Sequence, residues 1–187
     1  MDIMVDLETL GTKPDALIIA IGAVAFDNRM VRGTFYRTID WQSAADFGGK
    51  VDMSTIRWWF GQSDEARKAI LKDGSPVVLV LSEFTDWLSQ YDNVTIWGNG
   101  ATFDNVILGT AYDRLGIEKP WKYNADRCYR TVKELYPEVP RVKPSVAHNA
   151  LADALAQAEH LINIQEVSNG KIIQSEAGVH GGVSEKT

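Results

Sequence analysis

The sequence predicts one α/β domain, built on a mixed sheet that is covered by helices. Two patterns predict it: the first 40 residues read as three strands, and the following residues alternate between helical and strand periodicity. The chain has 187 residues, of which 45% are hydrophobic and 24% are charged. This length and composition are ordinary for a single globular domain with a substantial core.

Strands are expected at residues 2–8, 17–27 and 31–39. The segment GTKPDA at 11–16 contains Gly and Pro and is expected to be the loop between the first two strands. The segment DNR at 27–29 has the composition of a tight turn, which predicts a hairpin between the second and third strands. These three strands are therefore expected to be antiparallel.

The rest of the chain is expected to alternate between helices and strands. Residues 40–53 read as irregular, and residues 54–71 read as one short helix and part of another, broken near Gly61. Residues 75–91 read as a helix with Ser75 as N-cap, although their Val and Leu content also suits a strand. The remaining elements are expected to be a strand at 94–100, a helix at 103–116, a short strand at 121–127, a helix at 128–136 and a long Ala/Leu helix at 149–167. The domain is expected to span residues 1–167, and the polar, Gly/Ser-rich residues 168–187 are expected to form a flexible tail.

Composition narrows the classes of protein. The net charge of -6 argues against a broad electrostatic binder of nucleic acid, although it allows an enzyme that grips a few nucleotides locally. The single cysteine, Cys128, cannot form an internal disulfide. No apolar run approaches a membrane span and the N-terminus lacks a signal peptide, so a cytoplasmic protein without membrane contact is expected.

The first strand contains two acids in an apolar run, IMVDLETLG. Because strand side chains alternate, Asp6 and Glu8 point to the same face as Met4, and Ile3 and its odd-numbered neighbours point to the other. Two ionised carboxylates that lie this close repel each other, and a divalent cation between them removes the repulsion. The alternative is a strand end whose acids are solvated.

A third acid, Asp104, follows a Gly-flanked loop in GNGATFDNVIL and opens a helix. Its carboxylate is a candidate for the same site. The alternative is that it only interacts favourably with the helix dipole.

The segment HNALADALAQAEHL supplies His148 and Asp153. The core-facing stripe of this helix is expected to be Leu151, Leu155, Ala158 and Ile162. Asp153 lies off that stripe, among small alanines that permit close approach of the backbone. Asn149 is expected as N-cap, which leaves His148 before the helix and free to turn toward Asp153. The alternative for His148 is an ordinary surface histidine.

These three motifs together resemble those of the DEDDh 3′-5′ exonucleases, which have the ribonuclease H-like fold. The matching positions are Asp6 and Glu8, then Asn99, Phe103 and Asp104, then His148 and Asp153. The resemblance covers about residues 1–165, and TIRWWFGQSDEAR is most similar to the phage and mycobacterial exoribonuclease-like branch. It implies a three-layer α/β/α domain, with three antiparallel strands followed by parallel ones.

The resemblance also implies an activity and a cofactor. The chain is expected to hydrolyse phosphodiester bonds from the 3′ end of single-stranded RNA or DNA and to release nucleoside 5′-monophosphates. Asp6, Glu8, Asp104 and Asp153 are expected to bind two ions of Mg²⁺ or Mn²⁺, for which oxygen ligands are suited. His148 is expected to take the proton of the attacking water, since an unperturbed histidine titrates near pH 6.5.

By the same resemblance, substrate contacts are expected from the backbone at Thr9, the side chain of Leu10, Asn99 and Phe103. Ordinary core packing is an equal alternative for Leu10.

Trp58 is expected to point away from the helical face formed by Ile56, Trp59 and Phe60. Beside Arg57 it is a candidate platform for stacking a base. The alternative is a contact with a second subunit in a homodimer.

Two other functions have the same fold. A catalytically inactive module that binds nucleic acid or protein is disfavoured by the complete set of acids and His148. A ribonuclease H-like endonuclease is disfavoured by the His-x-x-x-x-Asp pair. RNA and DNA both remain candidate substrates, because a 2′-hydroxyl is recognised by only one or two local hydrogen bonds.

Overall fold

The computed structural model describes residues 1–179, and the side chains of residues 1–170. At its centre lies a five-stranded sheet in the order β3-β2-β1-β4-β5. The strands are β1 (Asp2–Thr9), β2 (Ile18–Phe26), β3 (Val31–Thr38), β4 (Thr95–Gly98) and β5 (Asp126–Cys128). Strands β1 to β3 are antiparallel, whereas β4 and β5 run parallel to β1, so the predicted mixed sheet is confirmed.

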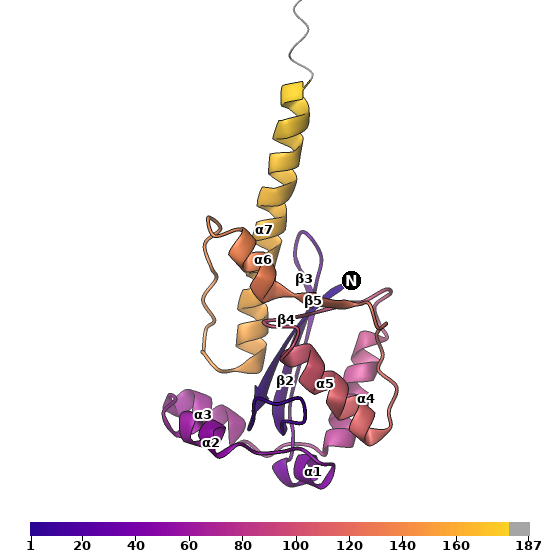
Figure 1. Ribbon diagram of the computed structural model, residues 1–187, viewed down its shortest axis with the longest axis vertical. Helices are drawn as coiled ribbons and strands as arrows, with labels where there is room; N and C mark the ends of the chain where they lie inside the picture. The colour runs from indigo at the N-terminus through magenta and orange to yellow at the C-terminus, as the bar shows by residue number, and fades with distance from the viewer. Residues whose placement is uncertain (180–187) are drawn as a thin grey trace, which may run out of the picture.

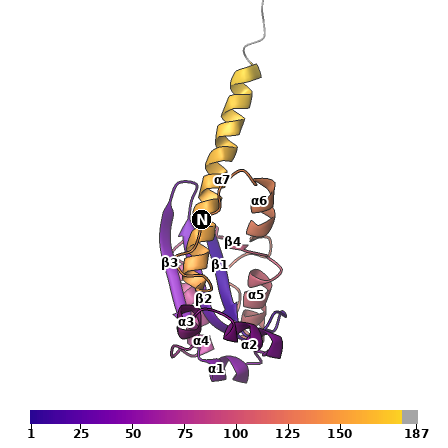
Figure 2. The same ribbon diagram turned by 90° about the vertical axis from the view of Figure 1, so that its left-hand side faces the viewer.

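Helices cover both faces of this sheet and make three layers, as predicted (Figure 1). They are α1 (Trp41–Asp46), α2 (Met53–Phe60), α3 (Asp64–Ile70), α4 (Val77–Leu88), α5 (Asp104–Leu115), α6 (Tyr129–Leu135) and α7 (Ala150–Val179). Helices α6 and α7 lie on one face and α4 and α5 on the other, while α7 extends well beyond the sheet (Figures 1 and 2). No helix within residues 1–179 is both long and apolar enough to cross a membrane.

Alternation along β1 sends its side chains into two separate cores. Ile3, Val5 and Leu7 join the larger core, with α4 and α5. Met4 joins the smaller one, with Ala154 of α7 and its neighbours. The predicted faces of β1 are therefore confirmed, and the carboxylates that share the face of Met4 lie on the α7 side of the sheet.

The sequence missed one helix and misplaced one cap. Residues 40–53 were expected to be irregular, but α1 forms there because the Asp40 carboxylate accepts a hydrogen bond of 2.7 Å from the Ser43 amide. Ser75 was expected to cap α4, yet its backbone pairs with the sheet edge and Pro76 occupies the cap position. The first free amide of α4, that of Val77, instead donates to the Ser43 hydroxyl at 3.0 Å.

Two other boundaries differ from the prediction. The strand expected at 121–127 is β5 and begins only at Asp126, because Trp121 packs against Tyr112 with ring centroids 5.5 Å apart. Helix α7 continues to Val179, past the expected end near residue 167, although this part of the helix contains Gly170 and Gly178. The predicted tail thus begins inside α7, and its last residues, 180–187, lie outside the described residues.

Candidate metal centre and active site

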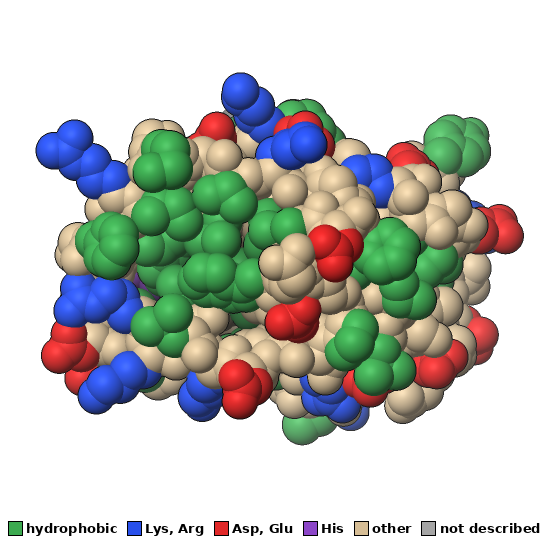
Figure 3. All heavy atoms as spheres, turned by 90° about the horizontal axis from the view of Figure 1, so that it is seen from below, with side chains coloured by type: hydrophobic (Ala, Val, Ile, Leu, Met, Phe, Trp, Pro, Cys, Tyr) green, Lys and Arg blue, Asp and Glu red, His purple; other side chains and the backbone are tan. Residues whose placement is uncertain are grey.

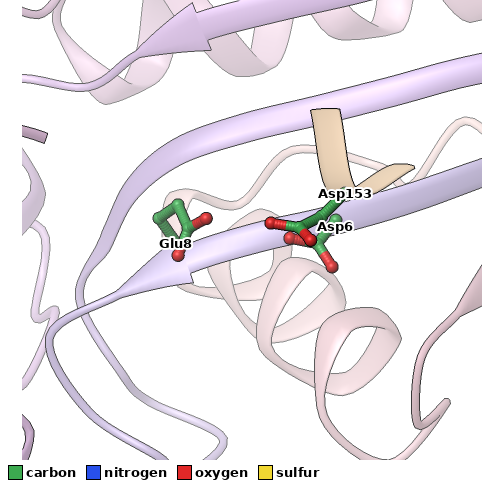
Figure 4. Close-up of side chains that lie close together, drawn as sticks. All are labelled: Asp6, Glu8 and Asp153. Atoms are coloured by element: carbon green, nitrogen blue, oxygen red, sulfur yellow. The ribbon is translucent and has the colours of Figure 1, made fainter. Parts of the chain in front are cut away.

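Three carboxylates from distant parts of the chain meet on the α7 side of the sheet. Asp6 and Glu8 project from β1, and Asp153 projects toward them from the first turn of α7 (Figure 4). One oxygen from each lies within 4.8 Å of the others. The three side chains can therefore hold one cation between them.

The start of helix α7 lies directly against the sheet, because β2 has no side chain opposite Asp6. The residue paired with Asp6 is Gly22, and a Cβ there would lie only 2.1 Å from the carbonyl carbon of Ala150. That separation is far below any real contact, so only glycine lets the start of α7 rest on the sheet. The close approach brings Asp153 beside Asp6.

Hydrogen bonds at the start of α7 fix the Asp153 side chain. The Asn149 side-chain oxygen accepts from the Ala152 amide at 3.1 Å, which confirms Asn149 as the N-cap. In return, one carboxylate oxygen of Asp153 accepts from the Asn149 amide at 3.1 Å. These bonds hold an Asp153 oxygen within 4.8 Å of oxygens of Asp6 and Glu8.

Asp104 approaches from the other side of β1. It is the first residue of α5, and one of its oxygens accepts from the Leu7 amide at 3.2 Å. A second glycine permits this, because a Cβ at Gly98 would lie 2.9 Å from the Asp104 Cβ. Asp104 is not part of the three-oxygen group, but its charge acts on both Asp6 and Glu8.

A cavity of about 540 Å³ opens over these acids. The residues predicted for the site that line it are Asp6, Glu8, Thr9, Trp58, Asn99, Phe103, Asp104, His148 and Asp153. The predicted contact by Leu10 is the exception. Its side chain is 2% exposed and packs in the larger core, which favours the alternative of core packing.

The acids hold protons more tightly than isolated carboxyls do. Burial, followed by repulsion from Asp153 and Asp104, raises the pKa of Glu8 to about 8. Burial raises the pKa of Asp104 to about 7, although backbone hydrogen bonds oppose the rise. Burial and three neighbouring carboxylates also hold the pKa of Asp6 well above its ordinary range. Without a bound cation, the ionised carboxylates of the site therefore repel one another and favour protonation.

The donor set fits a hard divalent cation. The atoms that the acids offer to a cation are all carboxylate oxygens. One oxygen of Glu8 is buried without a hydrogen-bond partner. An unpaired buried carboxylate oxygen is costly in free energy, and a bound cation removes that cost. The site thus has both the chemistry and the electrostatic need for a divalent metal ion.

The raised pKa values predict an unusual dependence of stability on pH. Between the ordinary pKa of Glu8, 4.5, and its folded value of about 8, the folded protein binds more protons than the unfolded chain. Stability of the metal-free protein should therefore be greatest near pH 5 and fall toward pH 8, by about 2–4 kcal/mol or roughly 5–15 °C in Tm. Added divalent cation should stabilise more at pH 8, because its ligands must be deprotonated.

Calorimetric melting at both pH values, after chelation and after adding Mn²⁺, measures this effect. Equal or greater stabilisation by the ion at pH 5 would contradict the electrostatic account of the site.

His148 lies at the entrance to the carboxylate group. It stands just before α7 with a left-handed backbone, at a φ of 60°, a conformation in which histidine is enriched. Its ring contacts Trp58 edge-on, with centroids 4.9 Å apart, and its charge acts on Asp153. His148 and Asp153 therefore line the same cavity.

The two tryptophans of α2 have different surroundings. Trp59 is 4% exposed and its ring N–H donates to the Thr9 carbonyl at 2.9 Å, whereas Trp58 is 46% exposed and forms a wall of the cavity. Phe60, the last residue of α2, was placed on the same helical face as Trp59, yet it is 74% exposed. Figure 3 shows hydrophobic side chains gathered on the underside of the molecule, where α2 and α3 lie.

Two polar residues that line the cavity, Gln157 and Arg130, make hydrogen bonds to residues predicted for the site. The amide of Gln157 donates to an Asp6 oxygen at 2.8 Å, and Arg130 of α6 donates to the Asn99 carbonyl at 2.7 Å. Gln157 stands four residues after Asp153, one turn along the same helical face, so this spacing was the available signal. No local pattern marks Arg130, because its place depends on packing of α6 beside the loop after β4.

Comparison with known proteins identifies similar sequences. Residues 1–165 match the family described as the 3′-5′ exoribonuclease Rv2179c-like domain. An exodeoxyribonuclease of Enterobacteria phage T4 is 31% identical over an alignment of 122 residues, and the match covers 57% of this chain and 53% of the phage protein. The chain thus spans about half the length of that relative.

Solved structures show a similar fold. The nuclease domain of 3′hExo, a DEDDh family member bound to rAMP, has a TM-score of 0.59 at 13% identity and covers 88% of this chain and 91% of its own. Exonuclease X in complex with 5′ overhanging duplex DNA has a TM-score of 0.58 at 17% identity, covering 90% and 93%. At these identities the likeness establishes the ribonuclease H-like fold.

Proposed function

Because the chain belongs to the family of 3′-5′ exoribonuclease Rv2179c-like domains, we propose that it is a metal-dependent exonuclease that releases nucleoside 5′-monophosphates from the 3′ end of single-stranded RNA or DNA. One observation supports this above all. Four carboxylates and a histidine from three separate segments line one cavity, which is open to solvent on the side of Trp58.

Two ions of Mg²⁺ or Mn²⁺ are the proposed cofactors. Asp6, Glu8 and Asp153 would hold one, and Asp104 together with Asp6 would hold the other. When bound, such ions supply an activated water and stabilise charge on the leaving 3′ oxygen. Gln157 keeps one oxygen of Asp6 in place, which leaves the orientation of the carboxylate fixed before any ligand arrives.

His148 is proposed to remove the proton from the attacking water. Its ring is held between the aromatic wall of α2 and the start of α7, so it reaches the cavity without being a member of the carboxylate group. Burial raises the pKa of Asp153, and the charge of the neighbouring His148 opposes that rise.

The 3′ terminal nucleotide is proposed to enter between α2 and the loop after β4. Trp58 offers an exposed aromatic face to a base, while Asn99 and Phe103 form the opposite wall. Thr9 lies on the floor, with its hydroxyl donating to the Gly11 carbonyl at 2.6 Å and its backbone held by Trp59.

The variant Trp58→Ala is expected to weaken substrate binding by about 1–3 kcal/mol, the range for loss of one stacked base. Its thermal stability should change little, because the ring is largely exposed. Steady-state kinetics with oligonucleotides should show the loss in KM.

Trp59→Ala serves as the matched control and should instead lose about 3–5 kcal/mol of stability, because that ring is buried. A Trp58→Ala variant that melts like Trp59→Ala with an unchanged KM would contradict the platform role.

The proposed activity is tested with 5′-labelled RNA and DNA oligonucleotides of the same sequence. An exonuclease produces a ladder that shortens from the 3′ end and disappears on chelation of metal. Both sugars are needed because the family is described as exoribonucleases, whereas the phage relative is an exodeoxyribonuclease. Internal cuts would indicate an endonuclease, and binding without cleavage would indicate an inactive module.

A further inference from the structure

Three cations lie together at one edge of the cavity. Arg130 and Lys133 are one turn apart on α6, and Arg141 follows in the loop to α7. They form a local positive surface, here called the α6 cluster, on a chain whose net charge is -6. Arg130 also lines the cavity, so the cluster is continuous with the candidate active site.

The α6 cluster is anchored to the loop that precedes Asp104. Arg130 donates to the Asn99 carbonyl at 2.7 Å, and the Lys133 ammonium donates to the Asn99 side-chain oxygen at 3.0 Å. The Lys133 ammonium also lies over the Tyr129 ring, 5.2 Å from its centroid. Each cation retains further N–H donors beyond these contacts.

A buried hydrogen-bond chain fixes the loop that bears Arg141. The Tyr129 hydroxyl lies 2.7 Å from Nδ1 of His160, and Nε2 of His160 lies 3.1 Å from the Val139 carbonyl. Because a carbonyl only accepts, Nε2 is the protonated nitrogen and Nδ1 accepts from the tyrosine. This chain ties the loop to α6 and α7 two residues before Arg141.

The cations of the α6 cluster are incompletely neutralised. Burial, followed by repulsion from Arg141 and Arg130, lowers the pKa of Lys133. Arg141 pairs with Glu134 at 3.1 Å, but the two side chains are 64% and 65% exposed, and such surface pairs contribute little free energy. An anionic ligand can therefore displace Glu134 readily.

We infer that the α6 cluster binds the phosphodiester backbone of the substrate strand on the 5′ side of the bond that is cleaved. This inference rests on the proposed function, since it takes the 3′ terminal nucleotide to occupy the cavity. The two walls then differ in role: the exposed aromatic ring of α2 contacts a base, and the cations of α6 contact successive phosphates.

The test measures binding without cleavage. Fluorescence anisotropy in EDTA compares labelled single strands of two and eight nucleotides over a range of NaCl concentrations. The proteins are the wild type, Arg141→Gln, the double variant Lys133→Gln/Arg141→Gln, and Arg32→Gln as a control. Arg32 is an exposed arginine paired with Asp27 at the far hairpin, so the control makes the same change of charge away from the site.

The wild type should bind the longer strand more tightly, with a steep salt dependence. The slope of log K against log salt should fall by about 0.7 in Arg141→Gln and by about 1.4 in the double variant, and it should stay unchanged in Arg32→Gln. An unchanged slope in the double variant, or no length-dependent binding by the wild type, would overturn the inference.

Cleavage of the same strands is assayed in parallel with Mn²⁺. A ladder with an unchanged salt slope means that the exonuclease proposal stands and the α6 cluster is not the phosphate site. A reduced slope without any cleavage means that the α6 cluster binds phosphates and that the exonuclease proposal is wrong.

Discussion

The variant Asp6→Asn is expected to lose hydrolysis almost completely. Asp6 lies among the other carboxylates, and its charge interacts with Asp104, Glu8 and Asp153. A neutral amide at this position should lower the affinity of the site for both proposed ions. Bound ions contribute several kcal/mol of transition-state stabilisation, so the rate should fall by about 10³-fold or more.

The thermal stability of Asp6→Asn should not fall with its activity. Removing one charge from a group of mutually repelling acids should raise the Tm of the chelated Asp6→Asn protein at pH 8, or leave it unchanged, although its calorimetric affinity for Mn²⁺ falls. Asp86→Asn, on the exposed surface of α4, is the control with the same charge change. Cleavage by Asp6→Asn at close to the wild-type rate would contradict the metal-centre proposal.

The variant His148→Ala is expected to be slow but still able to bind metal. Loss of a positioned base costs about 10²–10⁴-fold in rate. Because His148 lies outside the group of carboxylate oxygens, manganese titration should give an affinity close to that of the wild type. Acidification should lower the rate of both proteins, because Glu8 and Asp104 have raised pKa values and bind metal ions less tightly once they are protonated.

The variant Asp153→Asn is compared with His148→Ala to show whether His148 acts as a base or as a metal ligand. The asparagine can keep the hydrogen bond from the Asn149 amide, so the start of α7 should remain folded, but an anionic ligand is lost. Its affinity for manganese should therefore fall. If His148→Ala loses manganese as severely as Asp153→Asn, His148 is a metal ligand and not the base.

The sequence predicted the features that depend on local periodicity. The alternation along β1 placed Asp6 and Glu8 on one face, and the helical stripe of α7 left Asp153 off the core. The N-cap at Asn149 was also predicted, because capping depends on residues within one turn. Local pattern made these acids candidates, and the resemblance of the three motifs to those of the DEDDh exonucleases joined them into one predicted site.

What was missed depends on contacts between distant segments. Leu10 looked equally suited to the site or to the core, and it is buried in the larger core together with Leu17 and Trp59, which are distant from each other in the sequence. Ser75 has the composition of a cap but is drawn to the sheet edge by the Thr38 carbonyl. Arg130 reaches the cavity through the position of α6, which no spacing in the sequence specifies.

Gly22 and Gly98 have a consequence that reaches beyond the fold. Each lies beside β1 where a helix bearing an acid rests on the sheet, and each leaves no room for even a methyl group. The spacing between the acids of α5, β1 and α7 is thus set by two residues that have no side chain and touch no substrate. A survey that sought functional positions by their chemistry would pass over both, although enlarging either one would push an acid away from its partners.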